Sequence, residues 1–239
     1  MPLPKIATPT YELELPSTGE TVKYRPFLVK EEKVLVIALE SEDNKQITNA
    51  IKAVLKSCIL SKGIKVESLP TFDIEYLFLN IRGKSVGEDL EVNIICPDDE
   101  KTQVPVTIAL DEIEVQKNDN HSNKIKIDDS IMMELKYPSL DQFIKNNFDF
   151  NDKNAMDQSF ELIATCIDKI YTEDEVWATA DCTKKEMKDF LEQMNSNQFK
   201  EIESFFETMP KLSHSVSVTN PKTKVKREVV LEGLASFFA

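Results

Sequence analysis

The chain opens with apolar and polar residues in alternation on both sides of a short turn. In the segment YELELPSTGETVKY, Tyr11, Leu13 and Leu15 share one face, and the intervening glutamates take the other. Successive side chains of a strand point to opposite faces, so this period of two predicts β-strands, and Pro-Ser-Thr-Gly predicts the turn that joins them. We therefore expect an N-terminal β-hairpin.

The spacing of the apolar residues then changes from that of a strand to that of a helix. Three helices are expected before the middle of the chain. They cover residues 30–41, residues 44–60 and a segment that begins after Pro70. In the second of these segments the apolar residues recur at the spacing of one helical face, which is typical of an amphipathic helix.

The third of these helices contains the segment FDIEYLFLNIRGKSVGE. Its bulky residues Leu77, Phe78 and Ile81 are expected in the core. Arg82 and Lys84 are expected at an exposed end near the helix C-terminus, where the helix dipole favours cations.

Two β-rich runs, LEVNIICP and QVPVTIAL, follow on either side of a turn at residues 98–101. The Asp-Asp pair in the turn supplies side chains that bond to the local backbone. Pro105 has no backbone N–H to donate, so the second strand is expected to be an edge strand or to carry a bulge. After a polar loop, KIKIDDSIMMELKYPS predicts another pair of strands.

From Ser139 onward the spacing is again that of a helix. Capping boxes are expected from Ser139 to Gln142 and from Thr183 to Glu186. Residues 155–171 are expected to form one amphipathic helix, because their apolar residues fall on a single stripe. The last segments, KLSHSVSV and VKREVVLEGL, predict a C-terminal hairpin.

Together these patterns favour an α+β fold, in which N-terminal, central and C-terminal β-hairpins pack with several amphipathic helices. We divide the chain at the change of period. Residues 1–137 form a mixed α/β part with two hairpins and central helices, and residues 138–239 form a helical part that closes with the C-terminal hairpin.

Charge and composition narrow the classes of partner. The chain has 239 residues and a formal net charge of −13, which disfavours nucleic acid and anionic membrane surfaces as partners. The longest apolar run, VLVIAL, is too short to cross a bilayer, and no signal peptide is visible at the start. The four cysteines are scattered and read as free thiols, so we expect the chain to fold in the cytoplasm.

Cys96 stands in a Cys-Pro-Asp-Asp turn, where a zinc ribbon would hold a second cysteine. The turns near residues 16–22, 97–104 and 221–225 share a proline, a short polar loop, a threonine and a valine, and two of them have no cysteine. Cys96 is therefore interpreted as incidental, and no metal and no cofactor are expected.

Motifs of catalysis are absent from the sequence, and we predict that the protein is not an enzyme. The two histidines are far apart; His121 lies in a polar loop and is expected to be solvated, and His214 lies in a strand. The paired carboxylates are interpreted as solvated turns and helix starts, because acidic residues abound along this chain.

The C-terminal segment NPKTKVKREVVLEGLASFFA carries the candidate partner-binding residues. In an extended strand Lys222, Lys224 and Lys226 point the same way and form a basic ridge. The ridge either protects an edge strand from pairing with another sheet or guides the chain to an acidic partner. Phe237 and Phe238 either enter this protein's own core or, as we predict, anchor in a partner's pocket.

Three segments, MPLPKIATPTYELELPSTG, DIEYLFLNIRGKSVGE and NPKTK…LEGLASFF, together resemble the baseplate hub family of T4-like contractile-tailed bacteriophages. The similarity extends in order over nearly the whole chain. Some relatives carry paired cysteines near the position of Cys96, and this sequence departs from them.

The resemblance implies a non-enzymatic tail protein that acts in forming the baseplate hub through contacts with other hub and tail proteins. It implies assembly in the host cytoplasm and a final place in the virion's tail baseplate. Two alternatives stay open: a transient assembly chaperone that is absent from the virion, and a hub enzyme that degrades the cell wall. The sequence does not give an oligomeric state.

Overall fold

The structure is a computed structural model that describes residues 6–41, 43–140, 142 and 155–236. The chain forms two compact units. Unit 1 contains Met1–Val66, Phe72–Gln116 and Lys211–Ala239, and unit 2 contains Glu67–Thr71 and Lys117–Pro210.

These units do not follow the division expected between residues 137 and 138. Strands on the two sides of that division pair with each other in unit 2, where Glu134 lies opposite Lys169. Unit 1 is likewise assembled from both ends of the chain, because Lys211 lies opposite Gln116. The change of hydrophobic period marks a change of local structure and does not mark a boundary between these units.

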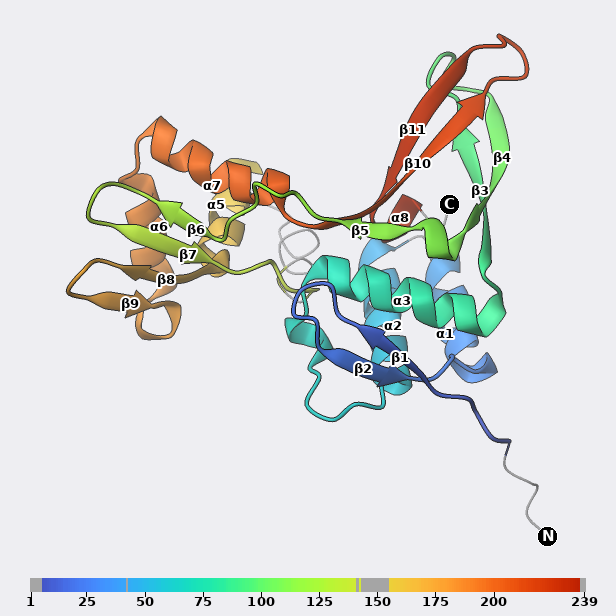
Figure 1. The fold of residues 1–239 in the computed structure, drawn as a ribbon, viewed down its shortest axis with the longest axis horizontal. Helices are drawn as coiled ribbons and strands as arrows, with labels where there is room; N and C mark the ends of the chain where they lie inside the picture. Colours follow the sequence, from blue (N-terminus) through green and yellow to red (C-terminus); the bar gives the residue numbers. More distant parts are fainter. Residues whose placement is uncertain (1–5, 42, 141, 143–154, 237–239) are drawn as a thin grey trace. The chain divides into compact units, whose positions relative to one another are not determined.

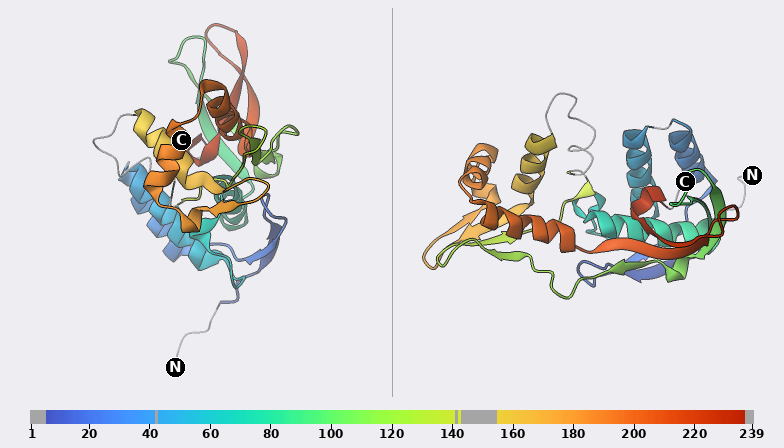
Figure 2. Two further views of the ribbon diagram at one scale, coloured as in Figure 1. Left: turned by 90° about the vertical axis from the view of Figure 1, so that its left-hand side faces the viewer. Right: turned by 90° about the horizontal axis from the view of Figure 1, so that it is seen from above.

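The first part of unit 1 confirms the N-terminal hairpin and the helices expected after it. Strands β1 and β2 are antiparallel, with Leu13 opposite Val22. Helices α1 and α2 lie side by side (Figure 2). The elements are β1 (Tyr11–Glu14), β2 (Thr21–Tyr24), α1 (Val29–Glu40), α2 (Asn44–Cys58) and α3 (Thr71–Val86). Most of the 3-10 helix Val66–Ser68 and the first residue of α3 belong to the short segment Glu67–Thr71 of unit 2.

The remainder of unit 1 is built from two hairpins that lie side by side (Figure 1). One hairpin is a two-stranded sheet in which Pro105 lies opposite Asn93, so the proline is in an edge strand as expected. The other belongs to a three-stranded sheet of order β11-β10-β5. The elements are β3 (Asp89–Ile95), β4 (Gln103–Ala109), the 3-10 helix Leu110–Glu112, β5 (Glu114–Gln116), β10 (Lys211–Thr219), β11 (Lys226–Glu232) and α8 (Gly233–Ser236).

Alternating residues of both hairpins bury their apolar faces against each other. Leu90, Val92 and Ile94 of β3 share a core with Leu212 and Val218 of β10. A half-buried sheet face of this kind is what the period of two predicts.

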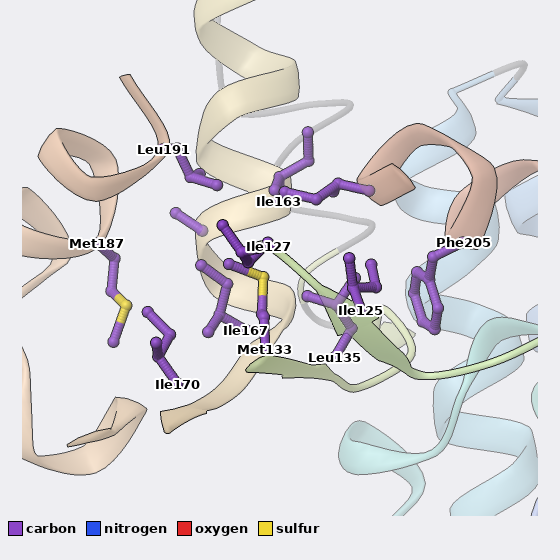
Figure 3. Close-up of a cluster of buried hydrophobic side chains, with 12 residues drawn as sticks. Ile125, Ile127, Met133, Leu135, Ile163, Ile167, Ile170, Met187, Leu191 and Phe205 are labelled. Carbon is purple, nitrogen blue, oxygen red and sulfur yellow. The ribbon is translucent and has the colours of Figure 1, made fainter. Parts of the chain in front are cut away.

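Unit 2 is a four-stranded antiparallel sheet of order β6-β7-β8-β9 with helices packed against it. Side chains from three helices, among them Ile163, Met187 and Phe205, meet Met133 and Leu135 of the sheet (Figure 3). The elements are β6 (Lys124–Lys126), β7 (Met132–Leu135), α5 (Ala155–Cys166), β8 (Ile167–Tyr171), β9 (Val176–Ala178), the 3-10 helix Thr179–Asp181, α6 (Lys184–Glu192) and α7 (Ser196–Thr208).

The helix expected over residues 155–171 is too long. Helix α5 ends at Cys166, and Ile167 and Ile170 lie in β8, where Ile170 is opposite Met133. A short apolar run is compatible with a buried strand as well as with a helix, and the β-branched isoleucines favour the strand. Both expected capping boxes are confirmed by reciprocal hydrogen bonds, at Thr183 with Glu186 and at Ser139 with Gln142.

Among the described residues, no helix combines the length and the apolar character that a membrane span requires.

Candidate functional site

Helix α1 leaves most of its apolar residues in solvent. Of its residues, Glu31 and Ala38 are buried, while Val29, Val34 and Ile37 are exposed, the last by 56%. A surface helix of a folded domain normally turns one apolar stripe to the core and a polar face to water. The apolar run VLVIAL therefore gives this helix a second apolar face, which unit 1 itself does not cover.

A buried polar network holds the start of α1 in place. The guanidinium of Arg25 donates to the Glu31 carboxylate at 2.9 Å, the Ser57 hydroxyl donates at 2.7 Å, and the Leu28 amide donates at 2.9 Å. Burial alone would raise the pKa of the Glu31 carboxyl, but these hydrogen bonds outweigh it and lower the pKa to about 2. The helix is thus anchored without burying its outer face.

A second set of hydrogen bonds connects the segment before α1 to the end of α3. The Phe27 amide donates to the Ser85 hydroxyl at 2.9 Å, and that hydroxyl donates to the carbonyl of Ile81. Ser85 thereby satisfies a backbone N–H outside the helix and links the chain just before α1 to α3.

An apolar pocket of about 380 Å³ lies between α1, α2, α3 and the start of β3. Its lining is apolar except for one arginine and two glutamates. Three apolar residues of the lining are partly exposed, Val36 by 46%, Leu39 by 39% and Val86 by 52%, so the pocket wall includes part of the exposed face of α1. The lining residues are Phe27, Glu32, Leu35, Val36, Ala38, Leu39, Ile47, Ile51, Phe78, Arg82, Val86, Leu90 and Glu91.

Arg82 is the unusual member of this lining. Its Nη1 atom is buried and has no hydrogen-bond partner among the described residues. Burial lowers the pKa of the guanidinium from its usual value. Leaving a buried donor without a partner costs roughly 1–3 kcal/mol, and more for a charged group. The buried donor is therefore unfavourable for the free chain, and the partly buried Arg82 side chain places a positive charge on the pocket wall.

The expectation of an exposed Arg82 is wrong. Leu77, Phe78 and Ile81 are buried as expected, and Lys84 is exposed and paired with Glu88. Arg82 instead turns into the pocket, because α1 and β3 cover the side of α3 on which it lies. The signal that could have located the pocket was the run VLVIAL, which has no polar side.

The predicted basic ridge is not an extended strand. Strand β11 begins at Lys226, Lys222 lies in the turn, and Lys224 has a φ of 64°, in the left-handed region. The three lysines are exposed, but period two does not align them, because the turn reverses the chain between them. Their partner-binding role stays a prediction. Phe237 and Phe238 lie outside the described residues.

The turn of β10 and β11 is joined to the turn that contains Cys96. The side-chain amide of Asn220 donates to both oxygens of the Asp98 carboxylate at 3.1 Å, and the Thr223 hydroxyl also donates to it. Asp99 accepts from the Thr102 hydroxyl and backbone amide. Asp98 and Asp99 therefore accept hydrogen bonds that stabilise these two turns.

Cys96 itself is buried in the core beside this turn. Burial, together with the negative charges of Asp98 and Asp99, raises the pKa of its thiol and disfavours the thiolate that binds metals. Over the described part of the chain, no three His, Cys, Asp or Glu side chains are grouped in a way that could hold a metal ion. The absence of bound zinc stays a prediction.

His121 is not the solvated loop residue that we expected. Its Nδ1 atom lies 2.9 Å from the Thr208 hydroxyl, and its Nε2 atom lies 3.0 Å from the Tyr137 hydroxyl. The ring also stacks on Tyr137 and contacts Phe205 at 5.1 Å between centroids. Burial lowers the pKa of the imidazole. These contacts make His121 a packing residue of unit 2.

Comparison with known proteins identifies a family. The model of the family described as T4 bacteriophage base plate protein matches residues 8–239. No curated protein and no solved structure matches the chain. The matched range includes all of unit 2, all of unit 1 from residue 8 onward and all the lining of the pocket.

Proposed function

Because the chain belongs to the T4 bacteriophage base plate protein family, we propose that it acts in forming the central hub of the tail baseplate through contacts with other baseplate proteins. Family membership makes it a phage baseplate protein. The hub, the assembly role and the absence of catalysis are the proposed parts. We expect the contacts to form in the host cytoplasm as the tail is assembled.

The observation that supports a role in protein contacts is the uncovered apolar surface of unit 1. Val29, Val34 and Ile37 of α1 are exposed, and Val36 and Leu39 lead into the pocket. Exposed apolar surface that is continuous and rimmed by polar residues marks interaction sites in folded proteins. In a baseplate protein, the neighbours available to cover it are other baseplate proteins.

The composition of the pocket supports a binding role over a catalytic one. Its wall offers apolar side chains for packing, one cation and two carboxylates, Glu32 and Glu91. Hydrolysis of a glycosidic bond requires a pair of carboxylates that flank the bond, one of them as a proton donor. We propose that the two glutamates act as charges at the edge of a contact surface.

The proposal is tested by following the chain through infection. An epitope-tagged copy is quantified by mass spectrometry in purified hub intermediates and in purified virions. Presence in both is expected for a structural subunit, and presence in the intermediates alone identifies a transient assembly chaperone. A chain found in neither, in cells that produce normal tails, would show that the hub role is wrong.

The non-enzymatic part needs its own measurement. Purified protein is incubated with dye-labelled peptidoglycan, with lysozyme as the positive control. We expect no release of dye above the buffer blank. Release that disappears in both Glu32→Gln and Glu91→Gln would identify a cell-wall hydrolase and contradict this part of the proposal.

A further inference from the structure

We propose that the pocket around Arg82 receives a segment of another baseplate protein, and that this segment carries one carboxylate among large apolar side chains, with basic residues beside it. The inference rests on the proposed function, because it takes the occupant from the proteins of the baseplate. It adds the chemistry of that occupant and the residue that recognises it.

The carboxylate is inferred from the guanidinium of Arg82. The Arg82 side chain is only partly buried and lines the pocket, where Phe78, Val86 and Leu90 of the same lining offer no side-chain acceptor. Its buried Nη1 atom also has no partner among the described residues. A guanidinium presents donors in a planar fork that matches a carboxylate. In an apolar, water-poor site such a charge-assisted pair is stronger than the same pair at the surface.

A comparison within the chain supports this reading of Arg82. The guanidinium of Arg25 is also shielded from solvent, and it bonds to the Glu31 carboxylate at 2.9 Å. Arg25 thus has inside unit 1 the kind of partner that the Nη1 atom of Arg82 lacks. A carboxylate is the partner that another protein could bring to the part of the Arg82 side chain that lines the pocket.

The apolar part of the occupant is inferred from the exposed part of the pocket lining. Val36, Leu39 and Val86 are each between 39% and 52% exposed, and they line the same pocket as Arg82. Arginine and aromatic or aliphatic anchors in a desolvated centre, ringed by contacts that exclude water, are the usual arrangement of residues that carry binding energy. Large apolar side chains next to the carboxylate would cover these three residues.

The basic residues are inferred from the rest of the lining. Glu32 and Glu91 also line the pocket, and the whole chain has a net charge of −13. The negative charge of the chain would repel a segment with several carboxylates. Lysines or arginines on either side of a single carboxylate could instead pair with the two glutamates. Charge complementarity of this kind steers encounter and selects among partners.

The first part of the experiment identifies the occupant. The photo-crosslinking residue p-benzoylphenylalanine replaces Val36, and in a second variant Leu39, in chains expressed during infection. A third variant carries it at Val176, which is 65% exposed in unit 2, as the control position. Because Val36 and Leu39 are both partly exposed, at least one of the two is expected to leave the fold intact, which circular dichroism checks.

We expect both pocket positions to crosslink to one peptide of another baseplate protein, with an Asp or Glu among apolar residues and Lys or Arg nearby. The control position is expected to give a different product or none. A crosslink to a second copy of this chain, to its own residues 237–239 or to a peptide without a carboxylate would overturn the proposal. So would the absence of any protein crosslink from a folded pocket variant.

The second part tests the pairing with Arg82. A synthetic peptide of the crosslinked sequence and its Glu→Gln or Asp→Asn form are titrated into wild-type protein and Arg82→Gln. Loss of a hydrogen-bonded charge pair predicts a roughly ten- to hundredfold weaker affinity for either single change. When Arg82→Gln is combined with the uncharged peptide, the affinity is expected to fall little further than with either change alone. Losses of binding free energy that are equal and additive would overturn the pairing.

Arg227→Gln is the matched control, because it removes the same charge from an exposed position on β11. Its affinity for the peptide is expected to stay within about twofold of wild type, since exposed charges contribute little. The two proposals fail in different ways. A chain that enters hub intermediates while both pocket variants give no crosslink contradicts the pocket alone, whereas a chain absent from hub intermediates contradicts the hub role.

Discussion

At the scale of single residues, the three arginines of the chain show how surroundings decide a side chain's role. Arg25 is paired with Glu31, Arg227 is exposed on β11, and Arg82 is turned into an apolar pocket. The sequence alone suggested an exposed Arg82 because it lies near a helix end. Its burial depends on α1 and β3, whose packing on α3 no local pattern reveals.

Arg82→Met is expected to stabilise the free protein. Methionine keeps most of the length of the side chain and removes the buried Nη1 donor, which has no partner among the described residues. We expect the free energy of unfolding to rise by roughly 1–2 kcal/mol, the lower part of the cost of an unsatisfied buried donor. Urea denaturation measures it, with Arg227→Met as a surface control that should change stability by less than about 0.5 kcal/mol. A clear loss of stability in Arg82→Met would show that the guanidinium already has a partner.

His121 predicts a dependence of stability on pH. Burial lowers the pKa of the folded imidazole, while the unfolded side chain has a pKa near 6.5. The unfolded chain therefore binds a proton first as the pH falls, so this contribution to stability is complete above about pH 6.5 and is lost below it. The slope from one such group is at most about 1.4 kcal/mol per pH unit.

His121→Gln is expected to reduce the fall in unfolding free energy between pH 7 and pH 5, because glutamine does not titrate. His214→Gln serves as the control and keeps the His121 contacts. Urea denaturation of all three proteins at several pH values is the measurement. An unchanged slope in His121→Gln would mean that another group causes the dependence.

At the scale of elements, the patterns with a clear local period were predicted correctly. The N-terminal and central hairpins, α2 and α3 all follow from period two or from a helical stripe. Strand β8 was missed, because a few isoleucines after a helix fit either structure, and the three-residue strand β9 is too short to show a period. The expected strand through Lys222 and Lys224 failed because Asn220 starts a turn that its own side chain stabilises.

Asn220 connects two hairpins whose turns are far apart in sequence. It is 1% exposed, and its side chain bonds to Asp98 and to the Lys222 amide. We expect Asn220→Ala to lower the free energy of unfolding by roughly 1–3 kcal/mol, because the Asp98 carboxylate and the turn lose buried partners. Asn93→Ala, at an exposed position of β3, is the matched control.

Hydrogen exchange distinguishes the cause of that loss. In Asn220→Ala the amides of Lys222 and Thr223 should exchange faster than in wild type, because both bond to the Asn220 side chain. A variant that is as stable as wild type and equally protected there would show that the two turns do not depend on this residue.

At the scale of the whole molecule, the larger segment of unit 2, Lys117–Pro210, is inserted between two segments of unit 1. The chain leaves unit 1 at Gln116 and returns at Lys211, and these two residues are paired in one sheet. No property of the local sequence reveals that pairing, since it depends on segments separated by all of unit 2. This explains why the change of period did not locate the boundary.

Replacing residues 117–210 by Asn-Gly should therefore leave unit 1 folded. Gln116 and Lys211 are directly opposite in antiparallel strands, and a two-residue Asn-Gly loop is the favoured connection for such a pair. We expect a cooperative melt and retained protection of the α3 amides in hydrogen exchange. An aggregated or unfolded product would show that unit 1 needs unit 2 to fold.

If this baseplate protein acts through the pocket around Arg82, phage assembly depends on that residue. The gene is inactivated in the phage, and particle yield is measured in host cells that supply wild-type protein, Arg82→Met or Arg227→Met. We predict that Arg227→Met restores the yield, while Arg82→Met, although folded and at least as stable as wild type, does not. A full yield of infectious particles with Arg82→Met would contradict the claim.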